Sequence, residues 1–487
     1  MPETVIVEHS RSVAHRELPP LPDPLEPGTG SILLFYQYQE PVWTKKEHKA
    51  VLKQVIALGE QYDIQGRGRV APEGLNCTLS SRDSARMREF CRALRAWNAL
   101  FEETDFKITD GVPHAQLFQS LSIRKTDELV AYGMAGARAP SLQHFAGQHL
   151  EADEYHEALQ DPNAVVIDVR NYYESCIGGF RPEGGAQVLD PKMRNSIEWS
   201  KWLADPATQK QLHGKKVLTY CTGGIRCERA TALINQMAAV NPDKFQPEGV
   251  YELRGGIERY IKTFPDGGHW KGKNYLFDKR KEQIPANRTM EEVEAEINTV
   301  CCLCLQKCTT YKGRHKCSQG LCGVAVIVCD HCNDSATAYP DLLQCDLCRE
   351  GYRAPELAPD LVTLKRKAEA VVDPKAGKRA QFEEKPNSST RLFISRLPLA
   401  ISKEKLADWL DGDIRLVQWL VDRTSGAFYG SCFVEMANAE LVAKIVKRPA
   451  LPFTGSKKKP KVAFAKETSD AWPPVDYKES EYPPIGN

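Results

Sequence analysis

The first third of the chain alternates short apolar runs with amphipathic stretches. The pattern predicts strands at 32–36, at 68–80 with a turn at Pro72-Glu73-Gly74, and near 106–109 and 121–129, with helices at 45–62 and 82–97. The order β-α-β-β-α-β is that of a ferredoxin-like sandwich. We therefore expect an α+β domain over residues 31–133, preceded by a disordered leader at 1–30.

The pattern changes from residue 150 onward. Short, wholly apolar runs at 164–169 and 217–220 alternate with helical segments such as 228–239. Buried strands separated by helical crossovers are typical of a parallel sheet that is covered on both faces. We expect an α/β domain over 150–265, followed by a linker and a helix over 266–300.

A third pattern of strands and helices closes the chain. Strands are expected at 392–395, 414–421, 432–436 and 461–465, with helices at 403–410 and 439–446. Residues 356–390 before it are rich in Lys, Ala, Glu, Pro and Ser, which is typical of a solvated linker. We expect a second α+β sandwich over 391–467 and a tail over 468–487.

Composition adds limits to this picture. The 487 residues are 42% hydrophobic and 26% charged with a formal charge of +1, which excludes a wholly disordered chain and a strong overall field. No apolar run has the roughly 18 residues that span a bilayer, and the N-terminus lacks the order of a secretory signal. We expect a cytoplasmic protein without a membrane partner.

Ten of the sixteen cysteines lie between Cys301 and Cys348, and we expect a cysteine-rich, zinc-type module over 301–355. In a large chain without a secretory signal, such crowding indicates metal or redox chemistry. The candidate ligands form three Cys-x2-Cys pairs with three further cysteines: Cys301 and Cys304, Cys329 and Cys332, Cys345 and Cys348, and then Cys308, Cys317 and Cys322. Two pairs can close a tetrahedral zinc site. The second and third pairs are the first choice for a single site; an iron–sulfur cluster and metal-free thiols are the alternatives.

The segment 217–228 places Cys221 where a buried strand ends and a helix begins. The free N–H groups of the first helical turn favour an anion there, and Gly223 and Gly224 let the backbone curl around the sulfur. Arg226 adds a positive charge. We expect a lowered pKa for Cys221 and a thiolate that attacks, or carries sulfur as a persulfide. The loop comprises Cys221, Thr222, Gly223, Gly224, Ile225, Arg226 and Cys227.

Two other interpretations of this loop are possible from the sequence. A buried structural cysteine beside a glycine turn is one. A phosphatase loop is another, but it separates Cys and Arg by five residues, whereas four separate Cys221 from Arg226. Cys227 has two equal interpretations: it resolves an oxidised Cys221 as a disulfide, or it packs in the core.

These residues resemble the rhodanese family. The segment 165–174 looks like the family's Asp-Val-Arg strand end, with Asp168 and Arg170 beside the loop. Together with 70–80, 250–257 and 270–278, the loop is similar to one branch, the tRNA uridine-34 hydroxylases. The resemblance implies an acylphosphatase-like N-terminal domain, a central rhodanese domain, and oxygen-dependent conversion of the wobble uridine of tRNA to 5-hydroxyuridine.

The C-terminal sandwich resembles an RNA recognition motif, in which a four-stranded sheet stacks bases on aromatic side chains. Phe393 and Phe433 stand at the positions of the stacking aromatics. The candidate phosphate contacts are Lys457, Lys458, Lys459 and Lys461. The alternative is a protein-binding sandwich with a solvated lysine turn.

The leading hypothesis is thus an RNA-directed rhodanese enzyme with Cys221 as the reactive group, a structural zinc, and tRNA or another RNA as partner. No motif for an organic cofactor is evident. An enzyme rival is a sulfurtransferase that takes sulfane sulfur from a small donor, thiosulfate or a persulfide. A non-enzyme rival is a zinc- and RNA-binding adaptor.

Overall fold

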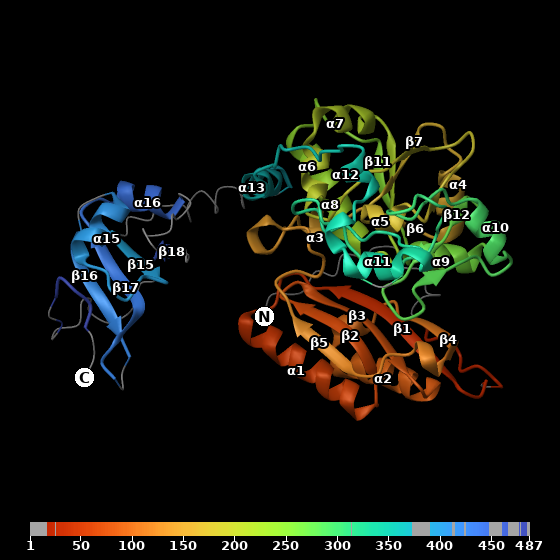
Figure 1. Ribbon diagram of the computed structural model, residues 1–487, viewed down its shortest axis with the longest axis horizontal. Helices are drawn as coiled ribbons and strands as arrows, with labels where there is room; N and C mark the ends of the chain where they lie inside the picture. The colour runs from red at the N-terminus through yellow and green to blue at the C-terminus, as the bar shows by residue number, and fades with distance from the viewer. Residues whose placement is uncertain are drawn as a thin grey trace. The chain divides into compact units, whose positions relative to one another are not determined.

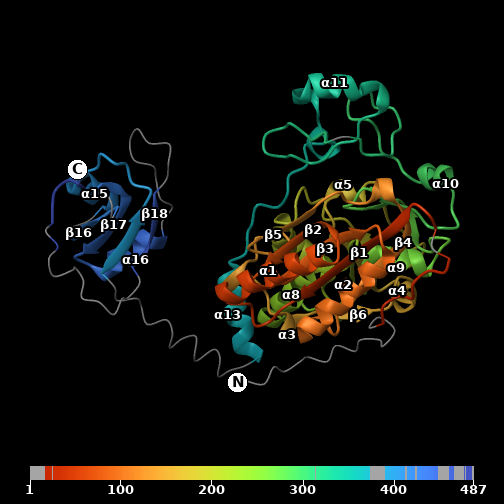
Figure 2. The same ribbon diagram turned by 90° about the horizontal axis from the view of Figure 1, so that it is seen from below.

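A computed structural model describes residues 17–24, 26–312, 314–372, 390–411, 414–422, 425–447, 460–465, 477 and 479–484. The chain divides into two compact units, Met1–Pro374 and Lys375–Asn487. Figures 1 and 2 show the two units in two views. Among the described residues, no helix is long and apolar enough to cross a membrane.

The first domain is the expected ferredoxin-like sandwich with one extra strand. Its elements are β1 (Thr29–Tyr38), α1 (Lys45–Gln61), β2 (Gln65–Ala71), β3 (Gly74–Ser81), α2 (Ser84–Trp97), β4 (Lys107–Pro113) and β5 (Leu121–Lys125). The sheet has the order β4-β1-β3-β2-β5. Helices α1 and α2 cover one face of it, and the other face is turned toward the second domain (Figure 1).

Local sequence explains where the first helix begins. The Thr44 hydroxyl accepts from the Glu47 N–H at 3.3 Å, and the Glu47 carboxylate accepts from the Thr44 N–H at 2.7 Å. This reciprocal pair satisfies two N–H groups that the first helical turn leaves open. Val51, Val55 and Leu58 then lie on one helical face and pack into the core under the sheet.

The second domain contains the expected parallel sheet. The strands are β6 (Gln148–Leu150), β7 (Ala164–Asp168), β9 (Gln187–Leu189), β10 (Lys216–Tyr220) and β11 (Gly249–Leu253), in the order β6-β11-β10-β7-β9. Every pairing between neighbours is parallel. Its helices are α3 (Leu142–Phe145), α4 (Ala152–Ala158), α5 (Tyr172–Ser175), α6 (Glu198–Ala204), α7 (Pro206–Leu212), α8 (Ile225–Val240) and α9 (Gly256–Thr263).

Short elements follow the parallel sheet and lead into the cysteine-rich segment, here called the cysteine module (residues 301–352). They are β12 (Trp270–Gly272), β13 (Asn274–Tyr275), β14 (Glu282–Gln283) and α10 (Met290–Ala295). β12 pairs with β8 (Gly178–Phe180), which lies between β7 and β9 in the chain. The helices in the described part of the module are short, and the α-helices among them are α11 (Asn333–Ala338) and α12 (Asp346–Arg349). Figure 2 shows it at the edge of the first unit, next to α5.

Two expectations about connecting segments are wrong in part. The linker expected over 356–390 contains a helix, α13 (Leu361–Val372), because Leu361, Leu364 and Ala368 share a face that packs against the second domain. The leader expected to be disordered over 1–30 is docked in its described part: Arg88 donates to the carbonyls of Pro19 and Pro20, both at 2.8 Å. Residues 1–16 and 373–389 lie outside the described residues.

The second unit is the expected β-α-β-β-α-β sandwich. Its elements are β15 (Arg391–Ser395), α15 (Lys403–Leu410), β16 (Ile414–Val421), β17 (Phe428–Met436), α16 (Ala439–Lys447) and β18 (Lys461–Phe464), in the antiparallel order β16-β17-β15-β18. The described part of the expected tail is docked. The Tyr477 hydroxyl donates to the Val417 carbonyl at 2.7 Å, and the Trp419 indole donates to the Ser480 carbonyl at 3.0 Å.

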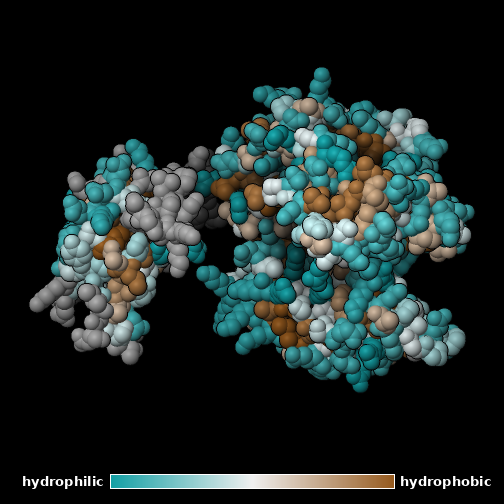
Figure 3. Space-filling model, in the orientation of Figure 1, coloured by the Kyte–Doolittle hydropathy of each residue, from teal (hydrophilic) through white to brown (hydrophobic). Residues whose placement is uncertain are grey.

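The surface on the side seen in Figure 3 is mainly hydrophilic, with small apolar areas on both units. The apolar side chains lie inside. The two largest clusters lie under the N-terminal sheet and on one face of the parallel sheet. Cys221 belongs to the second of these clusters, so the candidate reactive group is part of a domain core.

Candidate functional site

The loop 221–224 connects β10 to α8, as the sequence predicts. The Cys221 sulfur accepts a hydrogen bond from the Gly224 N–H at 3.1 Å. Gly224 has φ of +104°, a backbone conformation that favours glycine, and it turns the chain into the first turn of α8. The helix therefore begins directly beside the sulfur.

The pKa of Cys221 lies well below the usual value for a thiol. Burial alone would raise it, but contacts with Cys227, the charge of Arg226 and backbone N–H groups of Arg226 and Gly223 outweigh burial. The Cys227 pKa is raised well above the usual value by burial and by its neighbour Cys221. The pair can thus hold one negative charge, on Cys221, and the roles of Cys227 as resolving thiol or packing residue both stay predictions.

The Arg226 side chain makes its hydrogen bonds with groups other than the cysteine. Its guanidinium forms a two-pronged ion pair with Glu174 of α5, at 2.7 and 2.8 Å, and donates to the Thr222 hydroxyl at 3.1 Å. Glu174 is fully buried and Arg226 nearly so. A buried guanidinium needs a carboxylate partner, so Arg226 fixes the loop to α5 and acts on Cys221 through its charge.

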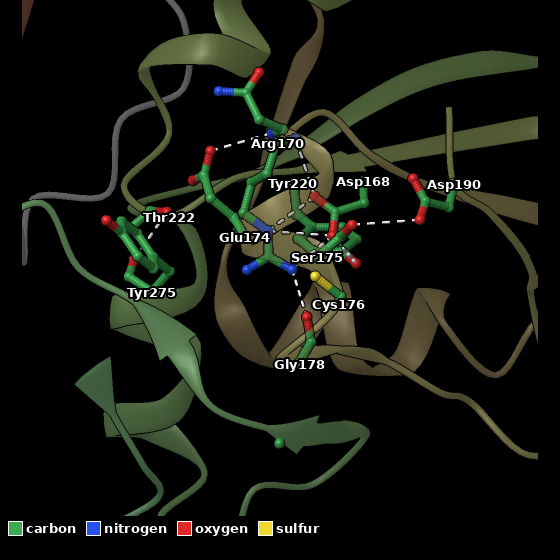
Figure 4. Close-up of polar contacts among 12 residues, drawn as sticks. Asp168, Arg170, Glu174, Ser175, Cys176, Gly178, Asp190, Tyr220, Thr222 and Tyr275 are labelled. Carbon is green, nitrogen blue, oxygen red and sulfur yellow. Dashed lines mark hydrogen bonds and ion pairs between the residues drawn. The ribbon is translucent and has the colours of Figure 1, made fainter. Parts of the chain in front are cut away.

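Asp168 and Arg170 form a second buried network, shown in Figure 4. Arg170 donates to Asp168 at 2.6 Å and to the Gly178 carbonyl at 2.6 Å. Asp168 also accepts from the Tyr220 hydroxyl at 2.9 Å. Tyr220 directly precedes Cys221, so this network ties the ends of β7 and β10 to β8. The network contacts the strand ends and not the Cys221 sulfur, and it fixes the end of β10 from which the loop starts.

Helix α9 holds the loop from the other side. The Ile257 N–H donates to the Cys221 carbonyl at 3.0 Å, and the Glu258 N–H donates to the Thr222 carbonyl at 3.2 Å. Gly256 precedes them with φ of +68°. A Cβ on Gly256 would lie 2.6 Å from both carbonyl oxygens, so only glycine fits this approach.

The N-terminal domain covers the loop, which the sequence did not indicate. Lys107 of β4 donates to the Gly223 carbonyl at 2.7 Å. Leu34 and Tyr36 of β1 leave no room for a side chain at Gly223 or Gly224: a Cβ there would lie 2.8 Å from the Leu34 side chain and from the Tyr36 hydroxyl, respectively. Cys221 is consequently inaccessible to solvent.

Ion pairs join the same two domains around the loop. Arg229 of α8 pairs with Glu73 at 2.8 Å and with Glu40 at 3.0 Å. Arg259 of α9 pairs with Asp105 at 2.7 Å. The contact between the domains is therefore partly polar and charged, and the Arg229–Glu73 pair is buried within it. Such a composition is found in interfaces that open and close.

The cysteines of the module form two groups of four, and the pairing expected first is wrong. The Sγ atoms of Cys301, Cys304, Cys329 and Cys332 all lie within 4.8 Å of one another, and so do those of Cys317, Cys322, Cys345 and Cys348. The second and third Cys-x2-Cys pairs thus belong to different groups, because each joins cysteines from earlier in the chain. Cys308 belongs to neither group; its sulfur lies 4.0 Å from the Thr310 carbonyl.

Both groups fit a tetrahedral ion. The Cys304 and Cys329 sulfurs are 3.7 Å apart, and so are the Cys322 and Cys345 sulfurs. Four thiolates at about 2.3 Å from one zinc ion lie roughly 3.8 Å from each other. Cysteine clusters of this kind can hold a metal ion. The module packs on α5 through Tyr172 and Tyr173, next to Glu174, the partner of Arg226.

The sheet of the second unit presents the two expected aromatics together. Phe393 and Phe433 are direct partners across β15 and β17, their ring centroids are 5.3 Å apart, and both are partly exposed. Lys461 is exposed on the adjacent strand, opposite Ser395. Lys457, Lys458 and Lys459 lie outside the described residues.

Comparison with known proteins agrees with this architecture. Residues 30–129 match the UPF0176 acylphosphatase like domain, 151–263 the rhodanese-like domain and 271–350 the rhodanase C-terminal domain. A tRNA uridine(34) hydroxylase of Acholeplasma laidlawii is 34% identical over 255 residues, which are 51% of this chain and 71% of that protein. The chain belongs to the UPF0176 family of rhodanese-domain proteins. The resemblance expected from the sequence motifs is thereby confirmed.

Two further matches cover other shares of this UPF0176 chain. Rhodanese-like domain-containing protein 6 of Arabidopsis thaliana is 38% identical over 301 residues, 59% of this chain. The chain spans about half the length of that relative, 48%. Among solved structures, the RNA binding protein PG1 matches over 17% of this chain and 100% of that chain, with 24% identity and a TM-score of 0.15.

Three groups that shape this UPF0176 site were missed by sequence reasoning. Glu174 had a weak signal, since Asn171 and Glu174 have the spacing of a capping box. Lys107 had none, because it comes from another domain, 116 residues before Gly223. Glu252 of β11, which lies 3.6 Å from His149, falls within the segment 250–257 of the family resemblance, but nothing in that pattern gives its carboxylate a role.

Proposed function

We propose that this protein hydroxylates the wobble uridine of tRNA, with the Cys221 thiolate as the reacting group, O₂ as the oxidant and an external two-electron reductant, so that one oxygen atom enters the pyrimidine ring and the other leaves as water. The observation that carries the proposal is the buried Cys221 at the junction of β10 and α8, whose pKa is lowered by Cys227, Arg226 and loop N–H groups. The name of the bacterial relatives supplies the substrate class. A thiolate is the form of cysteine that can add to a pyrimidine ring.

The closed loop sets a condition on this reaction. A nucleobase cannot reach Cys221 while Leu34, Tyr36 and Lys107 lie over the loop. We infer that the N-terminal domain moves away from α8 and α9 to admit the base, by breaking the ion pairs that Arg229 and Arg259 make across the contact. Extrusion of the target base into a pocket is the usual solution for enzymes that act on a base.

The cysteine module would hold two zinc ions in a structural role. The four-thiolate groups close tetrahedral sites without an open position, the arrangement of structural rather than catalytic zinc. The module also contacts α5, and α5 carries Glu174, the ion-pair partner of Arg226. The module would thereby help to hold Arg226 beside the loop. Iron in place of zinc, with visible absorbance, would contradict this assignment.

The second unit would bind RNA through the face that carries Phe393 and Phe433. Each exposed ring offers a stacking surface for one base, worth about 1 to 3 kcal/mol per base. Replacing both by Ala should weaken tRNA binding, whereas Tyr482→Ala, at a residue 67% exposed near the end of the chain, should leave it unchanged. Equal affinities of the two variants would favour a protein-binding sandwich.

The rival chemistry is sulfur transfer. The same thiolate could accept sulfane sulfur from thiosulfate or a persulfide and carry it as a persulfide. Mass spectrometry of wobble nucleosides from cells that lack this protein separates the two. Loss of 5-hydroxyuridine or its derivatives supports hydroxylation, and an unchanged profile supports the sulfurtransferase. If the protein is a non-catalytic adaptor, replacement of Cys221 should leave its RNA binding and the wobble nucleosides unchanged.

A further inference from the structure

A second cluster of chemistry-bearing side chains lies beside the Cys221 loop. His149 of β6, Glu228 of α8 and Glu252 of β11 each turn one ligand atom toward the same point, and these atoms lie within 4.8 Å of one another. His149 Nε2 is 3.2 Å from a Glu228 oxygen and 3.6 Å from a Glu252 oxygen. The three residues come from adjacent elements at the edge of the parallel sheet.

The buried state of Glu252 is the observation that needs an explanation. Its side chain is 1% exposed, and neither carboxylate oxygen has a hydrogen-bond partner among the described residues. A buried carboxylate without such partners is costly. Glu228 brings a second acidic group to the same place, 14% exposed. A cation between them would offset both charges.

The geometry fits an ion. Ligand atoms about 2.1 Å from a metal lie roughly 3.4 Å apart in a tetrahedral site and about 3.0 Å apart in an octahedral one. The separations of 3.2 and 3.6 Å are close to this range. One imidazole nitrogen with two carboxylate oxygens is a ligand set for divalent transition metals such as Mn²⁺, Fe²⁺ or Zn²⁺.

We propose that His149, Glu228 and Glu252 form a binding site for one divalent transition-metal ion, separate from the two cysteine groups. Tyr36 belongs to its surroundings, since its hydroxyl donates to the Glu228 carboxylate at 3.1 Å. Tyr36 also lies against Gly224. The ion would therefore sit where the N-terminal domain, α8 and the loop meet. His149 is 13% exposed, which leaves one side for water ligands and for entry.

The site is tested with Mn²⁺, an ion that favours nitrogen and oxygen ligands over thiolates. The full chain is titrated with MnCl₂ while free Mn²⁺ is followed by electron paramagnetic resonance. Its cysteine module is first loaded with zinc, and no chelator is added. We expect one Mn²⁺ bound per chain. In Glu252→Gln, which keeps the shape of the side chain, binding should weaken at least tenfold.

A matched control is Glu258→Gln. Glu258 is 2% exposed, as buried as Glu252, but it lies 3.9 Å from Arg280 and outside the cluster. This variant should bind Mn²⁺ like the unaltered protein. If Glu252→Gln does not fold, as judged by its melting temperature, His149→Ala replaces it, because His149 lies nearer the surface.

Two results would overturn the site: no stoichiometric Mn²⁺ binding to the unaltered chain, or equal binding by the Glu252→Gln and Glu258→Gln variants. Either result would mean that the three side chains share protons instead of a metal. The readout is independent of the proposed reaction, since it requires neither tRNA nor turnover.

Discussion

The Cys221 thiol is a buried group whose charge is favoured by its surroundings. Burial opposes ionisation, yet Cys227, the charge of Arg226 and the N–H groups of the loop together hold the pKa below the usual value. Arg226 can do this only because Glu174 compensates its own burial. The reactive sulfur therefore depends on a residue that never contacts it.

The lowered pKa predicts a particular pH profile. Iodoacetamide reacts with the thiolate, and it reaches the buried Cys221 only when the N-terminal domain moves away. This slow alkylation of Cys221 should persist as the pH falls below 9 and decline only near its lowered pKa. Cys77, whose pKa is raised to about 12 by burial, should lose reactivity at much higher pH. Peptide mass spectrometry after timed alkylation measures both. Parallel profiles for the two cysteines would show that the loop does not stabilise the thiolate.

The close contact of Gly256 in α9 with the loop predicts that Gly256→Ala destabilises the protein. Ala at this position would have an unfavourable φ. Its Cβ would also lie 2.6 Å from the carbonyl oxygens of Cys221 and Thr222, which is too close. Gly214 has the same φ, +69°, with nothing within 4 Å of a Cβ. Gly214→Ala should cost only the strain of about 1 to 2 kcal/mol.

Gly256→Ala should cost more and should also change the alkylation profile of Cys221. Thermal unfolding of both variants measures the difference. If they unfold at the same temperature and alkylate alike, α9 does not position the loop.

The cysteine module allows a test of which sulfurs share an ion. Cys317→Ser should remove one of two bound zinc ions, and Cys308→Ser should remove none, because only Cys317 belongs to a group of four. A chelator should release both ions and unfold the module first, since metal and fold are coupled in such modules. Elemental analysis gives the counts. Loss of zinc from Cys308→Ser, or two ions retained in Cys317→Ser, would contradict the grouping.

Sequence patterns predicted the elements well where each element carried its own signal. The strand and helix around Cys221 follow from local periodicity, and so does the order of strands and helices along the chain in both sandwiches. Pairing among cysteines does not, because three Cys-x2-Cys pairs and three further cysteines allow several combinations, and only the chain path selects one. Helix α13 was missed since Leu361, Leu364 and Ala368 stand out only against the surface that they cover.

Contacts between domains were beyond local patterns altogether. Nothing near Lys107 indicates that it binds the Gly223 carbonyl. The same contacts make the first unit a closed form in which the reacting sulfur is shielded. A closed form protects a thiolate from oxidation and requires opening for a large substrate.

Loosening this contact should expose Cys221. Arg259→Met removes the pair with Asp105 across the domains, whereas Lys216→Met removes the pair with Asp161 inside the second domain. Asp105 and Asp161 are equally exposed, 31%. Alkylation of Cys221 at constant pH should accelerate severalfold in Arg259→Met only. The same rate in both variants would mean that opening does not limit access.

The central claim is that Cys221 of this protein hydroxylates the wobble uridine of tRNA. The most direct measurement incubates the purified full chain with unmodified tRNA, oxygen and a two-electron reductant such as a dithiol, and analyses the wobble nucleoside by mass spectrometry. The unaltered protein should form 5-hydroxyuridine, and Cys221→Ser, with an unchanged melting temperature, should form none, because a hydroxyl with a far higher pKa cannot supply the anion. Formation of 5-hydroxyuridine by Cys221→Ser at the same rate would contradict the account.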